Sequence, residues 1–355
     1  MKLSVNNRIK STTWVQFVAK HPRANIFQTP EMYELYKLTT NYEPIILAAV
    51  NENDELQGVL LAVVQREHKG FLGKFSARSI IWGGPIIKDN NPTVLDFILV
   101  EYSKIIKGKA IYTQFRNQWE WSNEEKEVFK QNGFRFEEHL DIFISLKTTG
   151  DSLLNGMHQG RRKNIRRAQR IPLEFTEIVE HKDLMVCVQL IKKTYNRVGL
   201  PCPDSHFFIN AQEKFKGTEG LKIFAARYHG EIIACRFVLC HNKLIYDWYA
   251  GAHEEHIDKY PNDFLPFKVM EWGISNGYEL FDFGGAGKPN VNYGVRDFKL
   301  KFGGKLVNWG RFNNVHKPFL MFLGVTGIHF FKLIKNVWPV KNRNQRDFVV
   351  FKTKN

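Results

Sequence analysis

The stretch "LKIFAARYHGEIIACRFVLCHNKLIYDWYAGA", residues 221–252, decides the fold. It is rich in β-branched and aromatic residues, which predicts consecutive β-strands. Periodicity then predicts a helix over 262–277, a strand over 278–285, a helix over 293–303 and a strand over 304–315. The predicted order is therefore strands, helix, strand, helix, strand.

The same order occurs earlier in the chain, without obvious sequence identity. We expect a β-hairpin over 43–67, then helix, strand, helix and strand over 92–108, 109–117, 122–134 and 137–147. Helical patterns also precede each half, at 30–39, 181–199 and 206–217. Such an order predicts an α/β (α+β) class with two mixed sheets and helices on both faces of each. This element order is shared with the acyltransferase fold called GNAT.

Strand pattern changes to helix pattern near residues 147–152, where Asp151 or Ser152 is a candidate N-cap. We therefore expect two tandem GNAT-like domains, 1–149 and 150–355. A chain of 355 residues is also long for one compact core.

Composition limits the function classes. Hydrophobic residues make up 43% and charged residues 25%, as in ordinary globular proteins. The net charge of +15 favours a polyanionic partner such as nucleic acid, a phosphorylated substrate or an anionic membrane. The four cysteines form no C-x-x-C pair, so the sequence predicts no metal site, and the start has no apolar signal region, so we expect a cytoplasmic protein.

An apolar stretch at 318–331 is followed by basic residues. We expect a helix that packs on the body, in preference to a helix lying in a membrane interface. The basic residues still favour peripheral contact with the inner membrane surface.

Six basic residues and no acid lie in "QGRRKNIRRAQR", residues 159–170. On a helix, Arg162, Arg166 and Arg170 share one face, while Met157, Ile165 and Ala168 can turn toward the body. Aligned guanidinium groups suit phosphate or RNA, and we favour anion binding over a solvated charged surface.

Three other patterns give no site. "GGAGK" at 284–288 lacks the flanking residues of a phosphate loop, and "HEEH" at 253–256 has the wrong spacing for a metalloprotease. Residues 250–262 lack the Q/R-x-x-G-x-G/A turn on which an ordinary GNAT enzyme holds the pyrophosphate of coenzyme A, and they are acidic. Acyl-CoA is therefore a poorer donor candidate.

The segments 259–285 and 293–310, with "DFGG" and "FKLKFGG", together with "RRKNIRRAQR" at 161–170, resemble the Fem family of peptidoglycan-bridge aminoacyltransferases. The resemblance covers most of 150–318 and, more weakly, "IFQTPEMYELYK" at 26–37. It implies tandem GNAT-like domains, aminoacyl-tRNA as the donor, no cofactor, and the stem peptide of a UDP-linked or lipid-linked muropeptide as the acceptor.

The resemblance also assigns roles to residues. Phe298 and Lys299 match the phenylalanine-lysine pair of the family, whose lysine is implicated in placing the aminoacyl end and stabilising the transition state. By position alone, Lys37 and Arg197 are candidates for binding the phosphates of the acceptor.

The residues themselves suggest a chemistry that fits these roles. An ammonium at Lys299 could stabilise the oxyanion that forms when an amine attacks an ester, although a lysine reaching solvent from a helix edge is the simpler alternative. Gly284 and Gly285 let the backbone approach a ligand closely. Asp282 and Tyr293 are candidate acceptors for the proton of the attacking amine.

Two rival functions stay open. One is a GNAT-type N-acyltransferase that uses acyl-CoA on a sugar or amine of an envelope polysaccharide. The other is a non-catalytic RNA-binding or envelope scaffold, which the arginine-rich helix would serve equally well.

Overall fold

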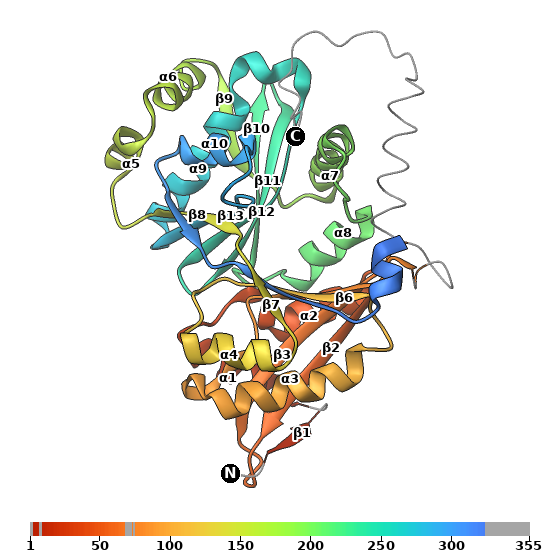
Figure 1. Cartoon of the computed structure of the whole chain (residues 1–355). Helices are drawn as coiled ribbons and strands as arrows, with labels where there is room; N and C mark the ends of the chain where they lie inside the picture. Colours follow the sequence, from red (N-terminus) through yellow and green to blue (C-terminus); the bar gives the residue numbers. More distant parts are fainter. Residues whose placement is uncertain (1–2, 7–8, 68–72, 74, 324–355) are drawn as a thin grey trace.

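Two mixed β-sheets form the framework of the protein (Figure 1). The computed structural model describes residues 3–6, 9–67, 73 and 75–323. The first sheet has the order β1-β2-β3-β4-β6-β15-β7, with β5 paired to β3, and the second has the order β14-β8-β13-β12-β11-β10-β9. The α/β (α+β) class with two mixed sheets is therefore confirmed.

The first sheet contains these strands: β1 (Ser4–Asn6), β2 (Tyr42–Val50), β3 (Leu56–Gln65), β4 (Arg78–Trp82), β5 (Ile86–Ile87), β6 (Tyr112–Arg116), β7 (Arg135–Glu137) and β15 (Arg311–Val315). The second contains β8 (Leu140–Ser145), β9 (Leu173–Glu177), β10 (Leu221–Tyr228), β11 (Glu231–His241), β12 (Leu244–Ala252), β13 (Leu280–Gly285) and β14 (Lys305–Asn308). The expected consecutive strands of residues 221–252 are β10, β11 and β12, paired antiparallel.

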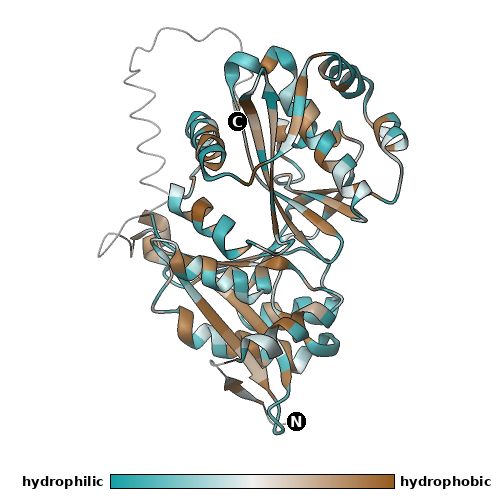
Figure 2. Cartoon of the chain, turned by 180° about the vertical axis from the view of Figure 1, so that it is seen from behind, coloured by the Kyte–Doolittle hydropathy of each residue, from teal (hydrophilic) through white to brown (hydrophobic). Residues whose placement is uncertain are grey.

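Helices cover both faces of each sheet, and many residues of the strands are hydrophobic (Figure 2). The longer ones are α1 (Ser11–Lys20), α2 (Pro30–Leu38), α3 (Pro92–Ile106), α4 (Asn123–Gln131), α6 (Gln159–Ala168), α7 (His181–Val198), α8 (Ser205–Lys214) and α9 (Pro261–Ser275). The shorter ones are α5 (Gly150–Gly156), α10 (Gly294–Leu300), and the 3-10 turns η1 (Ile26–Gln28), η3 (Lys88–Asn90) and η4 (Glu254–Lys259).

One hydrophobic core joins the two halves. It contains Trp14 and Leu35 from α1 and α2, and Leu190 and Phe207 from α7 and α8, packed with residues of both sheets such as Val59. Each Å² of apolar surface removed from water contributes about 25 cal/mol to the free energy of folding, so such a shared core is a major source of stability. The halves are therefore held as one body by their packing.

The sheets also exchange strands. The predicted strand over 137–147 is present as β8, in the second sheet, whereas β7 just before it was not predicted and lies in the first sheet. The predicted strand over 304–315 is divided, with β14 in the second sheet and β15 inserted between β6 and β7 in the first. The prediction of a single strand is therefore wrong over 304–315, and each sheet contains residues from both sides of the predicted boundary between 149 and 150.

A glycine permits the second crossing. Gly310 has φ 65, and a Cβ at this position would lie 2.2 Å from Cζ of Phe136. Only a residue without a side chain fits there, where the chain leaves β14 and enters β15.

Other differences from the predictions are local. The sequence analysis missed the short strands β1, β4, β5 and β9, because a run of two to five residues gives too little periodicity to separate a strand from a loop. The expected N-cap at Asp151 or Ser152 is wrong, since Oγ1 of Thr149 accepts the N–H of Ser152 at 3.3 Å and the helix begins at Gly150. Residues 318–323 of the expected helix 318–331 are helical, and the remainder lies outside the described residues.

Candidate acyl-transfer site

The site lies where two parallel strands of the second sheet separate. β12 and β13 pair only over Leu244–Tyr246 and Leu280–Asp282. Beyond this point β12 stays with β11, with a bulge at Trp248, while β13 continues along β8. Beyond this point the facing edges of β12 and β13 are not paired with each other, and the place where they separate is called the opening below.

Lys299 closes the β13 side of this opening. Helix α10 directs its Nζ at the glycine turn, where Nζ donates hydrogen bonds to the carbonyl oxygens of Phe283 at 2.6 Å, Gly285 at 2.8 Å and Gly284 at 3.3 Å. Gly284 has φ 67, which turns these carbonyls toward one point. The structure thus brings together Lys299, Gly284 and Gly285, three of the residues named from the sequence.

Burial lowers the pKa of Lys299, whereas the charges of Asp247, Asp141 and Asp282 act in the opposite direction. An ammonium in this position has all three protons directed at carbonyl oxygens. It therefore fixes the turn, and its positive charge remains beside the opening.

The other residues predicted from the motif have different surroundings. The ring of Phe298 lies 4.3 Å from the guanidinium of Arg161, and the carbonyl oxygen of Phe298 accepts a hydrogen bond from Arg161 Nη2 at 2.9 Å. Phe298 therefore holds α10 against α6. Tyr293 is the N-cap residue of α10 and is half-buried, and its ring packs against the glycine turn, because a Cβ at Gly287 would lie 3.0 Å from its Cδ1.

Asp282 is fully buried in β13, and its Oδ1 accepts the N–H of Gly284 at 2.6 Å. Burial, reinforced by the nearby charge of Asp141, raises the pKa of Asp282 well above its ordinary value. This favours the protonated acid. Asp141 of β8, opposite Gly285 in the sheet, has its pKa raised by burial to about 7, against the attraction of Lys299 and Arg311.

An ion pair that the sequence analysis missed lies across β11 and β12. Nη1 of Arg236 donates to Oδ2 of Asp247, and both side chains are almost fully buried. Nε of Arg236 and Oδ1 of Asp247 have no partner within the described part of the chain. The signal was present in the sequence, because Arg236, Asp247 and Asp141 are charged residues inside otherwise apolar strands.

The arginine-rich helix α6 has its apolar side where it was expected, since Ile165 and Ala168 are buried. Met157 is also buried, but it is the C-cap residue of α5 and lies outside α6. The basic residues of α6 differ from one another. Arg162 donates to the carbonyl oxygens of Asn155 at 3.0 Å and Met157 at 2.7 Å, and thereby caps α5.

The remaining basic residues of α6 divide into two kinds. Arg166 and Arg170 are exposed. Arg161 is buried, where it pairs with Asp263 and lies between the rings of Phe298 and Phe302. Arg161, one of the six basic residues of this stretch, is therefore a core residue.

Lys37 and Arg197 lie away from Lys299. Lys37 at the end of α2 is exposed and lies 3.9 Å from Glu34 of its own helix. Arg197 at the end of α7 pairs with Glu254. Neither is a partner of Lys299, and a role in binding the acceptor stays a prediction.

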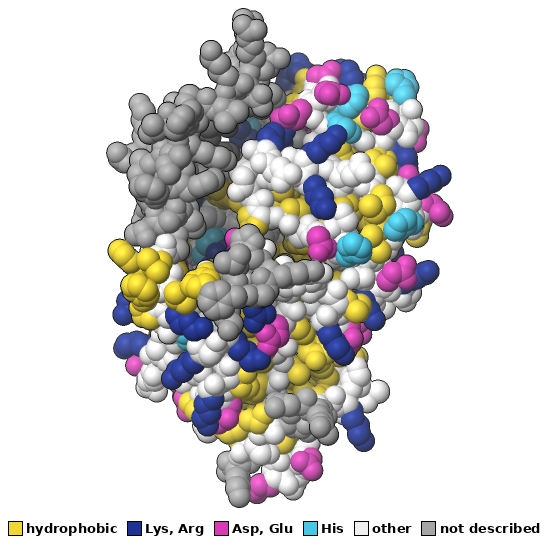
Figure 3. Space-filling view, turned by 90° about the vertical axis from the view of Figure 1, so that its right-hand side faces the viewer, with side chains coloured by type: hydrophobic (Ala, Val, Ile, Leu, Met, Phe, Trp, Pro, Cys, Tyr) yellow, Lys and Arg dark blue, Asp and Glu magenta, His cyan; other side chains and the backbone are white. Residues whose placement is uncertain are grey.

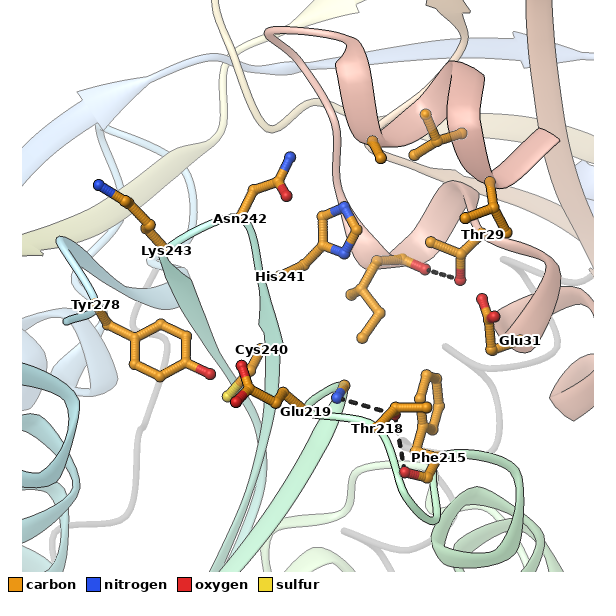
Figure 4. A pocket seen from close by; sticks show the side chains of 15 residues that line it. Thr29, Glu31, Phe215, Thr218, Glu219, Cys240, His241, Asn242, Lys243 and Tyr278 are labelled. Carbon is orange, nitrogen blue, oxygen red and sulfur yellow. Dashed lines mark hydrogen bonds between the residues drawn. The ribbon is translucent and has the colours of Figure 1, made fainter. Parts of the chain in front are cut away.

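The larger cavity, of about 310 Å³, lies elsewhere (Figure 4). It is bounded by α1, α2 and the β11–β12 turn, with Glu31, His241, Lys243 and Tyr278 on its wall. These residues precede the paired ends of β12 and β13, so this cavity is at the opposite end of the strands from the opening. It contains none of the residues predicted from the sequence.

One exposed surface bears on membrane contact. The side chains of Phe319 and Phe322 are 71% and 64% exposed, and Val315 is 41% exposed. On the face of the molecule that carries this segment, hydrophobic side chains lie beside lysines and arginines (Figure 3). In the described part of the chain, no helix is long and apolar enough to cross a membrane, and no group of side chains suits a metal ion.

Comparison with known proteins agrees with this geometry. Residues 158–299 match the family described as acetyltransferase (GNAT) domain. A search of curated proteins gives no match. The two sheets with their separated strands thus define a tandem protein of the GNAT acyltransferase fold.

Among solved structures, the chain is similar to FemX, with a TM-score of 0.71 and 18% identity over 91% of this chain and 99% of FemX. It is also similar to a tandem GNAT protein from the clavulanic acid biosynthesis pathway (TM-score 0.57, 9% identity, 89% of this chain and 99% of that one). A third similar structure is L-PGS from Bacillus licheniformis, with a TM-score of 0.52 and 17% identity over 82% of this chain and 92% of that one. The Fem-like fold expected from the sequence is therefore confirmed.

Proposed function

We propose that the protein is an aminoacyltransferase that moves an amino acid from aminoacyl-tRNA to an amine in the stem peptide of a peptidoglycan precursor. The observation that carries the proposal is the ammonium of Lys299, held by three carbonyl groups beside the opening between β12 and β13. This residue is also the lysine of the phenylalanine-lysine pair in the Fem-like motif. FemX, whose fold is similar over nearly its whole length, supports the same proposal.

In the proposed reaction, the neutral amine of the acceptor attacks the ester carbonyl carbon of aminoacyl-tRNA. A C–N bond forms, the C–O bond to the ribose breaks, and the proton of the amine passes to the ribose oxygen. Negative charge develops on the carbonyl oxygen in the transition state, and the positive charge of Lys299 stabilises it in a site with little water.

A side chain can relay that proton. Asp282 is a poor acceptor, because its raised pKa favours the form that already holds a proton. Asp141 has a pKa of about 7 and lies opposite Gly285, so we assign the relay to Asp141. A base is most effective when its pKa is near the working pH.

The segment between β12 and α9 supports a donor other than acyl-CoA. This segment is the 3-10 turn Glu254–Lys259 with acidic residues in its first turn, and α9 begins with Pro261, which has no N–H to offer a phosphate. An N-acyltransferase that uses acyl-CoA is the second candidate, favoured by the match of residues 158–299 to the acetyltransferase description.

The test is to incubate the protein with a full set of radiolabelled aminoacyl-tRNAs and with UDP-linked and lipid-linked muropeptides. Transfer of label from one or two of the tRNAs to the peptide is the expected result. The absence of transfer, under conditions in which a Fem enzyme is active, would overturn the proposal. Calorimetry with coenzyme A tests the second candidate, and we expect no heat of binding.

A further inference from the structure

A small polar cavity lies where the two sheets meet. Its volume of about 30 Å³ has room for one or two water-sized groups. Both halves supply its wall: Arg116 comes from β6, Arg311 from β15, and Asp141 and Gly285 from the second sheet. The carbonyl oxygen of Gly285 is a partner of Lys299, so the cavity adjoins the proposed acyl-transfer site.

Two arginines from adjacent strands, Arg116 and Arg311, lie side by side on the wall of this cavity. Arg116 and Arg311 are directly opposite in the antiparallel pair of β6 and β15, an arrangement that costs free energy for like charges. Both donate to the same oxygen, Oε1 of Gln114, at 2.9 and 3.2 Å, and Arg116 also lies 4.1 Å from the ring of Trp82. Within the described residues, neither forms an ion pair, and most of their N–H groups are left for a ligand.

The surroundings of Arg116 and Arg311 add to the free-energy cost of keeping their two positive charges close together. Burial lowers the pKa of Arg116 to about 10, and the charge of Arg311 acts in the same direction. Two acids also line the cavity, Asp141 and Asp282. The raised pKa of Asp282 favours its neutral form, whereas ionised Asp141 lowers the charge of the group from two positive to one. Oε1 of Gln118, which also lines the cavity, is buried with no donor among the described residues.

We propose that Arg116 and Arg311 bind a carboxylate of the acceptor, so that the acceptor amine belongs to a molecule with a free carboxyl group, as in an amino acid or a peptide C-terminus. Planar guanidinium groups match the two oxygens of a carboxylate. The volume and the net charge of one favour a monoanionic carboxylate over a phosphate dianion, which Asp141 would repel. This inference rests on the proposed function, since it assigns the substrate class of the same site.

The proposal also explains the position of the cavity. A carboxylate held by Arg116 and Arg311 leaves the rest of the acceptor to extend past Gly285 toward Lys299. Oε1 of Gln118 has no donor among the described residues, and the amide N–H next to a peptide carboxylate could donate a hydrogen bond to it. The inserted strand β15, which supplies Arg311, thereby becomes part of substrate recognition.

Binding tests the proposal without any tRNA. We would titrate the full chain by calorimetry with acetyl-Lys-Ala, with its C-terminal amide and with inorganic phosphate. The free carboxylate should bind at least about tenfold more tightly than the amide, as expected when a charge-assisted pair is lost. Arg116→Gln and Arg311→Gln should each remove this preference, and Arg135→Gln, which removes an exposed charge from β7 of the same sheet, should keep it.

Each other outcome has a defined meaning. Equal affinity for the acid and the amide in the unaltered protein, or a preference that survives both cavity variants, would overturn the proposal. Tighter binding of phosphate would overturn the assignment to a carboxylate. If Arg116→Gln does not fold, Arg116→Lys keeps the charge without the planar fork and should weaken the preference. A carboxylate preference without transfer from tRNA would leave this site standing and refute the proposed function alone.

Discussion

Replacing Lys299 with methionine removes the ammonium and keeps most of the side-chain volume. The change deletes two short hydrogen bonds, 2.6 and 2.8 Å, and a longer one of 3.3 Å. A hydrogen bond to a charged group contributes about 1.5–3 kcal/mol, and the variant no longer has to desolvate a buried ammonium, so we expect a net loss of about 2–4 kcal/mol in the free energy of unfolding. A domain of ordinary stability remains folded after such a loss.

The effect on catalysis should be larger. Removing one group that stabilises an oxyanion lowers kcat by about 10²–10³-fold, and we expect a loss of this size in transfer from aminoacyl-tRNA. The assay is single-turnover transfer at saturating acceptor, with urea denaturation of the same samples. Lys301→Met is the matched control, because Lys301 is exposed two residues along the chain and should keep full activity.

The control experiment separates an electrostatic role from a purely structural one. If Lys299 only fixes the glycine turn, the activity of Lys299→Met should recover when glycerol or a lower temperature restores its stability. Such a recovery, or activity within threefold of the unaltered protein, would refute the oxyanion role.

Three further changes test other parts of the structure. Arg161→Met breaks a buried ion pair and should cost about 3–5 kcal/mol in urea denaturation, whereas Arg166→Met on the exposed side of the same helix should change stability by less than about 0.5 kcal/mol. Because burial raises the pKa of Asp141 to about 7, the transfer rate should rise with pH through neutrality, and Asp141→Asn should abolish this rise. The raised pKa also means that ionised Asp141 destabilises the fold, so the unaltered protein should lose stability relative to Asp141→Asn as pH increases from about 4 to 7. Gly251→Ala would place a Cβ 2.6 Å from the backbone of α7 and should cost about 1–3 kcal/mol, while Gly156→Ala meets no atom within 4 Å and should be neutral or stabilising.

The order of helices and strands could be predicted from the sequence because it depends on local periodicity. Lys299, Gly284 and Gly285 were each named from the sequence, but their contact was not predicted, because it depends on how α10 packs on the end of β13. Which sheet a strand joins is not a local property. The positions of Asp141 and Arg311 follow from the exchange of β8 and β15, and no alternation of apolar residues reveals that exchange.

The burial of charged residues was the second feature that could not be predicted from the sequence. Helical spacing placed Ile165 and Ala168 correctly, because apolar residues determine the inward face. Arg161 was named only as one of six basic residues, and its burial depends on Asp263, about 100 residues away, and on two aromatic rings that give it a polar and stacked environment inside. A buried charge depends on its partner, and the partner is known only from the tertiary structure.

The insertion of β15 between β6 and β7 has a consequence for biosynthesis. During translation, β7 has no neighbour in its sheet until residues 311–315 have left the ribosome, because β15 is the strand with which it pairs. The amino-terminal half should therefore stay incomplete while most of the chain is made, and its edge at β6 is exposed during that time. Truncated chains that end before residue 311 would expose the same edge, which makes them candidates for chaperone binding and degradation.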